Sequence, residues 1–176
     1  AREQALGCGM SQGNSSQRRL GIVMWLLAWL LGLALFTWYF QQKLVQDHNP
    51  NQQLQQLDPQ TIVLKQNRYG HYLASGSINN ESVVFLLDTG ATQVAVPQQI
   101  AQRLELVAGP KIGLNTAAGR VVGYQTKIKS LSLGPFNLYD LQAVIMPSES
   151  DEILLGMNAL RQFELIQRDG HLTIKR

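Results

Sequence analysis

The sequence predicts an all-β domain of many short strands with one or two short helices, preceded by a single transmembrane helix. Residues 20–40 contain no charged residue, and 21 largely apolar residues are about the length that crosses the hydrocarbon core of a membrane as a helix. Residues 61–176 contain β-branched and alternating runs separated by turn signals. Many short strands with few helices are typical of a small barrel or sandwich.

The apolar segment 20–40 holds all three tryptophans of the chain. Trp38 and Tyr39 lie at its end, where amphipathic rings favour the membrane interface. A buried core helix would be shorter and would have a polar face. A cleaved signal peptide would have a shorter apolar region followed by a small-residue cleavage site, which the next residues, TWYFQQKLV, do not offer. We therefore predict an uncleaved transmembrane anchor.

Residues 1–19 are predicted to be a cytoplasmic N-terminal segment. Arg18 and Arg19 stand immediately before the anchor, against the single Lys43 after it, and positive charge favours the cytoplasmic side. This predicts a single-pass protein of the inner (cytoplasmic) membrane whose folded domain is periplasmic or otherwise extracytoplasmic. Cys8 is the only cysteine and precedes the anchor, so the exported part has neither a disulfide nor a thiol nucleophile.

The segment after the anchor, residues 41–60, is predicted to be a Gln-rich linker. Glutamine is its commonest residue and two prolines interrupt it. This composition favours flexible coil with at most a short frayed helix. Such a linker would tether the next domain close to the membrane surface.

Residues 61–176 are predicted to form the β-rich domain. Strands are expected in TIVLKQN (61–67), HYLASGSIN (71–79), SVVFLL (82–87), GRVVGYQTKIKSLSLG (119–134), LYDLQAVIM (138–146) and HLTIKR (171–176). The turn signals are Arg68-Tyr69-Gly70, Asn79-Asn80, Gly134-Pro135 and Asp169-Gly170. Short helices are expected within residues 97–106 and 157–163.

Asp88 interrupts an apolar stretch, because VVFLL precedes it and apolar residues resume at Val94. Burying an ionised carboxylate there would cost several kcal/mol unless it is paired or hydrogen-bonded. In one interpretation Asp88 is a catalytic acid in a tight turn, where Thr89 locks the turn and Gly90 lets backbone approach the carboxylate. In the other, Asp-Thr-Gly is a plain turn that ends a strand.

Three segments in order resemble one family of enzymes. FLLDTGATQVAVP (85–97) resembles the active-site strand of retropepsin-like aspartic proteases, and EILLGMNAL (152–160) resembles the second signature of that family. Between them, LNTAAGRVVGY (114–124) resembles the flap hairpin that closes over substrate. The resemblance covers residues 61–176, about one retropepsin protomer, and is closest to the bacterial membrane-anchored branch. It implies a retropepsin-like acid-protease β-barrel.

The resemblance also implies roles for particular residues. Asp88 is expected to be the catalytic carboxylate. Its expected support consists of Thr89, Gly90, Ala91, Leu154, Leu155 and Gly156. The expected flap and substrate-binding residues are Thr116, Ala117, Ala118, Gly119, Arg120 and Val121. Residues 154–156 should therefore cross close to Asp88, and a structure that placed them far apart would contradict the protease interpretation.

The sequence departs from the retroviral pattern at two positions. Retroviral members place an acid directly after Asp-[Ser/Thr]-Gly-Ala and pair it with an arginine directly after the helix-opening glycine. This chain has Thr92 and Met157 at these positions. Both partners of the ion pair are absent together, so no charge is left unpaired.

The chain carries a single Asp-Thr-Gly, whereas aspartic protease chemistry needs two carboxylates that share a proton and a water. We therefore predict a homodimer whose two-fold axis brings Asp88 of each copy together, acting on a peptide or protein substrate. No metal and no cofactor is predicted, because His48, His71 and His171 lack a ligand spacing. A net charge of +3 without a basic cluster predicts no nucleic-acid partner.

Together these observations predict a membrane-anchored aspartic endopeptidase. Two alternatives stay open. One is a retropepsin-fold module that binds or assembles at the membrane without turnover, and the other is an unrelated anchored β-domain that contains the tripeptide by chance. The intact Asp-Thr-Gly-Ala favours the endopeptidase, because a module that only binds has no reason to keep the acid.

Overall fold

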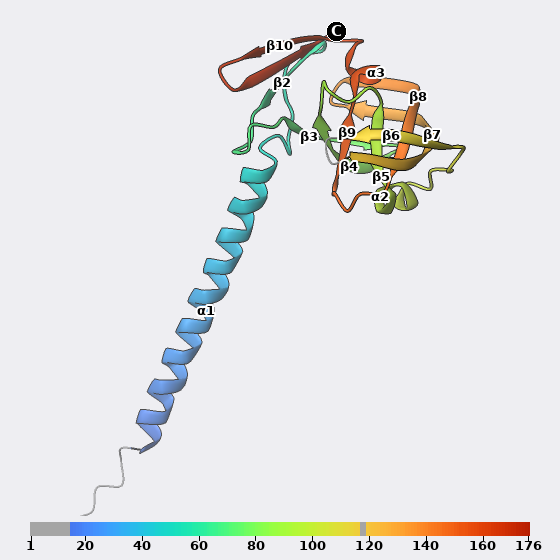
Figure 1. Cartoon of the computed structure of the whole chain (residues 1–176). Helices are drawn as coiled ribbons and strands as arrows, with labels where there is room; N and C mark the ends of the chain where they lie inside the picture. Colours follow the sequence, from blue (N-terminus) through green and yellow to red (C-terminus); the bar gives the residue numbers. More distant parts are fainter. Residues whose placement is uncertain (1–14, 117–118) are drawn as a thin grey trace, which may run out of the picture. The chain divides into compact units, whose positions relative to one another are not determined.

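The computed structural model describes residues 15–116 and 119–176, which Figure 1 shows as a cartoon. These residues fall into two compact units. One ends at Leu44, and the other comprises Val45–Arg176. The second unit contains every strand of the chain that the structure describes.

The first described element, α1 (Ser15–His48), is one continuous helix. From Arg19 onward it is long and apolar enough to cross a membrane, a test that a signal sequence near the N-terminus also passes. Its apolar side chains, Trp25 and Trp29 among them, are exposed. A contiguous apolar surface of this kind marks contact with lipid or with another protein.

The larger unit contains a seven-stranded sheet that closes on itself. Its strands are β3 (Leu73–Ile78), β4 (Glu81–Leu87), β5 (Val94–Pro97), β6 (Lys111–Thr116), β7 (Gly119–Leu133), β8 (Phe136–Met146) and β9 (Glu152–Leu155). Their spatial order is β3-β4-β9-β5-β8-β7-β6, and β3 also pairs with β7. This additional pairing closes the sheet into a barrel, with β6 attached to the first part of β7. The barrel predicted from the sequence is confirmed.

A second, four-stranded sheet belongs to the same unit. Its strands are β1 (Gln55–Asp58), β2 (Thr61–Lys65), β10 (Glu164–Arg168) and β11 (His171–Lys175), in the antiparallel order β1-β2-β11-β10. Buried residues of this sheet, such as Ile62 and Ile174, belong to the same hydrophobic core as Phe85 of the barrel. One core therefore fixes both sheets.

Two hairpins have the turns that the sequence predicted. Asn79 and Asn80 join β3 to β4, and Asp169 and Gly170 join β10 to β11. All four residues have positive φ. Two such residues in succession indicate a type I′ turn, whose twist matches that of paired strands and which Asn, Asp and Gly tolerate well.

Two short helices lie where the sequence predicted helices. α2 (Gln98–Arg103) follows β5 and buries Ile100 and Ala101. α3 (Met157–Leu160) follows β9 and buries Ala159 and Leu160. Both are shorter than their predicted ranges.

The Gln-rich segment 41–60 is not the flexible coil that its composition predicted. It continues α1 to His48 and then forms β1. The buried side chain of Asn51 orders the residues between these elements. Its Nδ2 donates to the carbonyls of Lys65 and Leu73 at 2.8 and 2.7 Å, and its Oδ1 accepts from the N–H of Lys65 at 2.7 Å. A buried amide with this many partners ties the segment to β2 and β3.

Candidate active site

Asp88 follows β4 directly, and β9 lies beside β4 in parallel. Leu87 lies opposite Leu155, and the backbone N–H of Asp88 donates to the carbonyl of Leu155 at 3.2 Å. The prediction that residues 154–156 cross close to Asp88 is confirmed. Pairing with β9 determines where β4 ends and therefore where the acid lies.

The turn after β4 holds the carboxylate in one orientation. The backbone N–H of Gly90 donates to Oδ1 of Asp88 at 2.8 Å, and the N–H of Ala91 donates to the Asp88 carbonyl at 3.2 Å. A Cβ at position 90 would lie 3.1 Å from Oδ1, which is tighter than ordinary van der Waals contact. Glycine therefore suits the close approach of backbone to the acid.

The loop after the turn is fixed to the start of α3. The N–H of Met157 donates to the carbonyl of Ala91 at 2.8 Å, and the N–H of Asn158 donates to that of Thr92 at 3.1 Å. Thr92 and Met157 are the two positions at which the retroviral ion pair is absent. Backbone hydrogen bonds join the two segments here without any charge.

Gly156 lies where the two segments approach most closely. It is buried, and a Cβ at this position would press on the carbonyl oxygen of Gln93 and lie 2.8 Å from that of Ala91. Both obstacles are backbone atoms, which cannot rotate away. A residue without a side chain is therefore required where β9 leads into α3.

Asn158 supports the same loop, and the sequence reasoning did not single it out. Its Oδ1 accepts from the N–H of Val94 at 3.0 Å, and its Nδ2 donates to the carbonyl of Gln142 at 2.7 Å. Asn158 thus joins α3 to β5 and β8. An amide within the otherwise apolar MNAL segment is the signal that could have identified it.

The acid itself is half-buried, and Thr89 and Gly90 are exposed. This differs from the deep burial that the apolar flanks of Asp88 indicated, because the turn leaves the core at the end of β4. A cavity of about 300 Å³ adjoins it, lined by Gly70, Tyr72, Leu87, Asp88, Thr89, Leu160, Leu165, Gln167 and Leu172. The hydroxyl of Tyr72 is buried and has no hydrogen-bond partner among the described residues.

The predicted flap residues lie in the hairpin formed by β6 and β7. Thr116 lies opposite Gly119, and its hydroxyl donates to the Gly119 carbonyl at 2.7 Å. Gly119 has a φ of +117°, a conformation that glycine adopts without the strain other residues would suffer. The strands of the predicted hairpin are therefore present.

The remaining flap residues are spread over the same hairpin. Arg120 is exposed and Val121 is half-buried, both on β7. Ala117 and Ala118 lie outside the described residues. Within the described part of the chain, no hydrogen bond joins this hairpin to Asp88, so the structure brings the Asp88 turn and β9 together but does not connect the hairpin to them.

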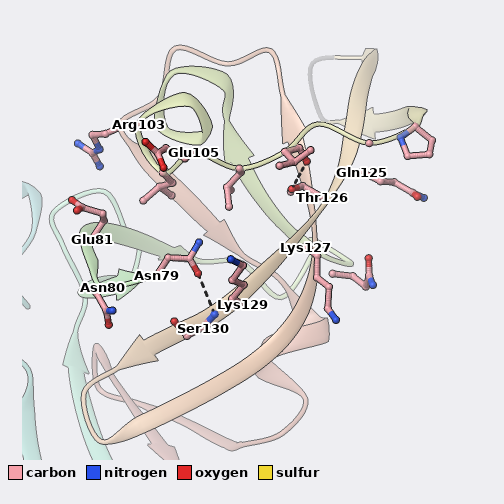
Figure 2. A pocket seen from close by; sticks show the side chains of 16 residues that line it. Asn79, Asn80, Glu81, Arg103, Glu105, Gln125, Thr126, Lys127, Lys129 and Ser130 are labelled. Carbon is pink, nitrogen blue, oxygen red and sulfur yellow. Dashed lines mark hydrogen bonds between the residues drawn. The ribbon is translucent and has the colours of Figure 1, made fainter.

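A second cavity, of about 890 Å³, contains none of the predicted site residues. Figure 2 shows side chains of both charges around it, including Arg103, Glu105 and Lys129. In the two described ranges, no group of three His, Cys, Asp or Glu side chains is placed to hold a metal ion. The Asp88 turn is therefore the candidate site.

The fold and the Asp88 turn together define a retropepsin-like aspartic protease domain. The family model "gag-polyprotein putative aspartyl protease" matches residues 74–162, a range that runs from β3 to α3 and includes the Asp88 turn. The chain belongs to this family of aspartyl proteases.

Two solved structures are similar to the chain. The retropepsin-like aspartic protease from Rickettsia conorii has a TM-score of 0.56 at 23% sequence identity, over 65% of this chain and 89% of that chain. The EIAV protease in complex with the inhibitor HBY-793 has a TM-score of 0.45 at 20% identity, over 55% of this chain and 90% of that chain. The first of these establishes the retropepsin-like fold.

A protein from Sinorhizobium sp., described as an uncharacterized protein in the cobV 5′ region, is 26% identical over 112 residues. The match covers 61% of this chain and 48% of that protein. The chain thus spans about half the length of this curated relative.

Proposed function

We propose that this chain is an aspartic endopeptidase that is anchored in a membrane by α1 and acts as a homodimer. One observation carries the proposal. Asp88 stands at an accessible surface, on a turn that β9 and α3 fix in place. One carboxylate cannot serve as base and as acid in the same step, and a second copy would supply the other.

The proposed reaction uses the two acids in different protonation states. Asp88 of one protomer is ionised and accepts a proton from a water, whose oxygen attacks the carbonyl carbon of the scissile peptide bond. The partner subunit's Asp88 is protonated and donates to the carbonyl oxygen. The diol intermediate then collapses as the C–N bond breaks and a proton passes to the leaving nitrogen. The products are a carboxylic acid and an amine, and no metal or cofactor takes part.

The other predicted residues are proposed to support this chemistry. Thr89, Gly90 and Ala91 would maintain the turn, and Leu154, Leu155 and Gly156 would hold it from β9. The β6–β7 hairpin, residues 116–121, would close over the peptide and bind it as an added strand. The predicted substrate is accordingly an extended peptide segment.

The membrane anchor is proposed to be the charge-free part of α1, residues 20–40. Its length, its composition and its exposed apolar side chains support this assignment. Arg18 and Arg19 before it favour a cytoplasmic N-terminus. The protease domain would then lie on the periplasmic or extracytoplasmic side of the inner membrane.

The deciding experiment compares the full chain in detergent micelles with its Asp88→Asn variant, using unfolded casein as substrate from pH 4 to 7. Asparagine keeps the size of the side chain but cannot exchange a proton, so we expect the hydrolysis rate to fall about a thousandfold. Asp151→Asn, at an exposed carboxylate before β9, is the matched control and should leave the rate unchanged. Equal rates for wild type and Asp88→Asn would favour a retropepsin-fold module that binds without turnover.

A further inference from the structure

β4 and β9 turn alternate side chains to opposite faces of the barrel sheet, because side chains alternate along a strand. On one face Phe85 and Ile153 belong to the hydrophobic core. The other face holds half-buried residues that the core of the described chain does not include, namely Val84, Leu86, Glu152 and Leu154. We call these four residues, together with Asp88, the acid face.

Asp88 belongs to this face because the alternation of β4 continues to it. It stands two residues after Leu86, and its N–H donates to the carbonyl of Leu155 at 3.2 Å, as the next step of the ladder between β4 and β9. Val84 and Glu152 lie opposite each other, four residues before the acid, which is about 13 Å along the strand. An extended substrate segment of about four residues covers the same distance. A substrate side chain close to the scissile bond can therefore reach Glu152.

The end of α1 crosses the acid face at Val84. Nε2 of His48 lies 2.6 Å from Oε1 of Glu152, on the β9 side of Val84. On the β3 side, Ser75 lies opposite Val84, and the Ser75 hydroxyl accepts from Nδ2 of Asn49 at 3.1 Å. All of these residues belong to the larger compact unit. His48 and Asn49 therefore mark the end of the acid face that is farther from the catalytic candidate.

The backbone around His48 is held in place by buried amides. Asn49 is 5% exposed. The carbonyl of His48 accepts from Nδ2 of Asn67 at 3.1 Å. Buried amides with hydrogen-bond partners on other strands give a segment one defined position. The His48 ring is therefore placed against Glu152 by the fold.

Both carboxylate oxygens of Glu152 are occupied by neighbours. Oε1 contacts His48, and Oε2 accepts from the hydroxyl of Ser150 at 2.6 Å. The Glu152 side chain is 20% exposed, against 53% for His48. A carboxylate that already has a partner on each oxygen attracts a further cation less strongly than one with a free oxygen. Glu152 is therefore an acid on the acid face that His48 and Ser150 keep occupied.

We propose that His48 is a specificity-determining residue, which occupies Glu152 and so keeps the acid face selective for uncharged substrate side chains. The inference rests on the proposed endopeptidase function and adds a residue of α1 to it. The other members of the face between Glu152 and the acid are apolar, which suits uncharged side chains. Without His48, the freed Oε1 of Glu152 would attract a Lys or Arg side chain of the substrate.

Identification of the cleaved bonds tests this role. The full chain in non-ionic detergent micelles and its His48→Ala variant digest unfolded casein at pH 5, and mass spectrometry identifies the peptide bonds that are cleaved. We expect His48→Ala to raise the frequency of Lys and Arg about fivefold at one position within about four residues of the cleaved bond, because a substrate cation replaces the partner that Glu152 has lost. A merely structural role of His48 would change the rate and leave this preference as it is.

Two further variants show whether the carboxylate is responsible. The double variant His48→Ala/Glu152→Gln lacks the freed carboxylate, so its preference should return to within about twofold of wild type. Asp47→Ala, at the exposed residue before His48, is the matched control and should cleave the same bonds as wild type. A double variant that keeps the preference for Lys and Arg would overturn the proposal.

Peptide binding measures the same preference without turnover. Two fluorescein-labelled decapeptides, one of alternating Thr and Lys and one of alternating Thr and Gln, are titrated with the full chain carrying Asp88→Asn, alone or together with His48→Ala. Fluorescence anisotropy in the same micelles gives the dissociation constants. We expect loss of His48 to move their ratio about fivefold in favour of the Lys peptide.

The outcomes separate this inference from the proposed function. If casein is hydrolysed and His48→Ala changes neither the cleaved bonds nor the binding ratio, the endopeptidase stands and the role of His48 is wrong. If neither wild type nor any variant hydrolyses casein and the binding ratio still shifts, the role of His48 stands and the endopeptidase is wrong. Absence of both hydrolysis and shift would overturn both.

Discussion

At Gly156 the chain has room for backbone and nothing more, because the carbonyl oxygens of Gln93 and Ala91 occupy the space that a side chain would need. The same carbonyl of Ala91 accepts from the N–H of Met157. The close packing at Gly156 and the hydrogen bond from Met157 together hold the loop that follows Asp88. Substitution at position 156 should therefore disturb the acid without touching it.

We expect Gly156→Ala to lower the free energy of unfolding by about 2–4 kcal/mol, since the obstructing atoms belong to the backbone. Urea unfolding of the full chain in detergent micelles, followed by circular dichroism, measures this. Gly113→Ala is the matched control, because the three atoms nearest to its Cβ would belong to the flexible side chain of Arg120, the closest at 3.3 Å. Equal effects in the two variants would contradict the packing described for Gly156.

The places of residues in the fold were predictable from the sequence where a local pattern carries them. Asp88 and Gly90 stand in a tripeptide after an apolar strand, and Gly156 stands between an apolar pair and a short helix. Asn51 and Asn158 have no such pattern. Their partners are backbone groups of strands elsewhere in the sequence, so the neighbouring residues do not reveal which groups these amides bind, even though the apolar MNAL segment makes Asn158 stand out.

At the scale of elements, the sequence predicted several β-branched or alternating strands, but it did not predict the short apolar strands β5 and β9 or the strands β1 and β10, which pairing alone makes. β1 has four exposed residues and exists because it pairs with β2. β10 exposes most of its residues and is defined by its hairpin with β11. Composition gave no sign of either strand. The Gln-rich composition of the residues before β2 predicted flexible coil instead, because a polar composition does not reveal tertiary hydrogen bonds.

A contact between His48, the last residue of α1, and Glu152, the first residue of β9, makes stability depend on pH. Nε2 of His48 lies 2.6 Å from Oε1 of Glu152, and the hydroxyl of Ser150 donates to Oε2 at 2.6 Å. Partial burial alone would raise the pKa of Glu152. The hydrogen bond from Ser150 and the neighbouring His48 outweigh burial and hold the pKa of Glu152 below its ordinary value of 4.5.

A carboxyl group whose pKa is lower in the folded than in the unfolded chain stabilises the fold above the unfolded value. That stabilisation is lost as the pH falls through the folded value. We therefore expect Glu152→Gln to be less stable than wild type at pH 6, and the difference to shrink as the pH falls below 4.5. Urea unfolding at several pH values measures it. Glu149→Gln, at an exposed carboxylate, should show no such trend.

At the scale of the whole molecule, the sequence predicted the barrel and the apolar helix but not the sheet that joins β1, β2, β10 and β11. A barrel can be predicted from strand count and from the resemblance of its three signatures. The second sheet pairs segments from the two ends of the domain, and nothing in either segment alone specifies the other.

A membrane-anchored dimer should respond to its surface density. We expect the specific activity of the full chain in lipid vesicles to fall as the lipid-to-protein ratio rises at constant bulk concentration, because the protomers are diluted within the membrane. Casein hydrolysis across a series of ratios measures this. In micelles, addition of empty detergent should have the same effect. Activity that follows bulk concentration alone would contradict confinement by α1.

The path of β9 has a consequence for how the protein is made. β9 enters the sheet between β4 and β5. The carbonyl of Leu155 accepts from the N–H of Asp88, and Leu155 follows Asp88 in the chain by 155 − 88 = 67 positions. The ribosome synthesises Asp88 before Leu155, and contacts between segments so distant in the chain form late and slowly. A nascent chain therefore contains the acid well before it contains the site.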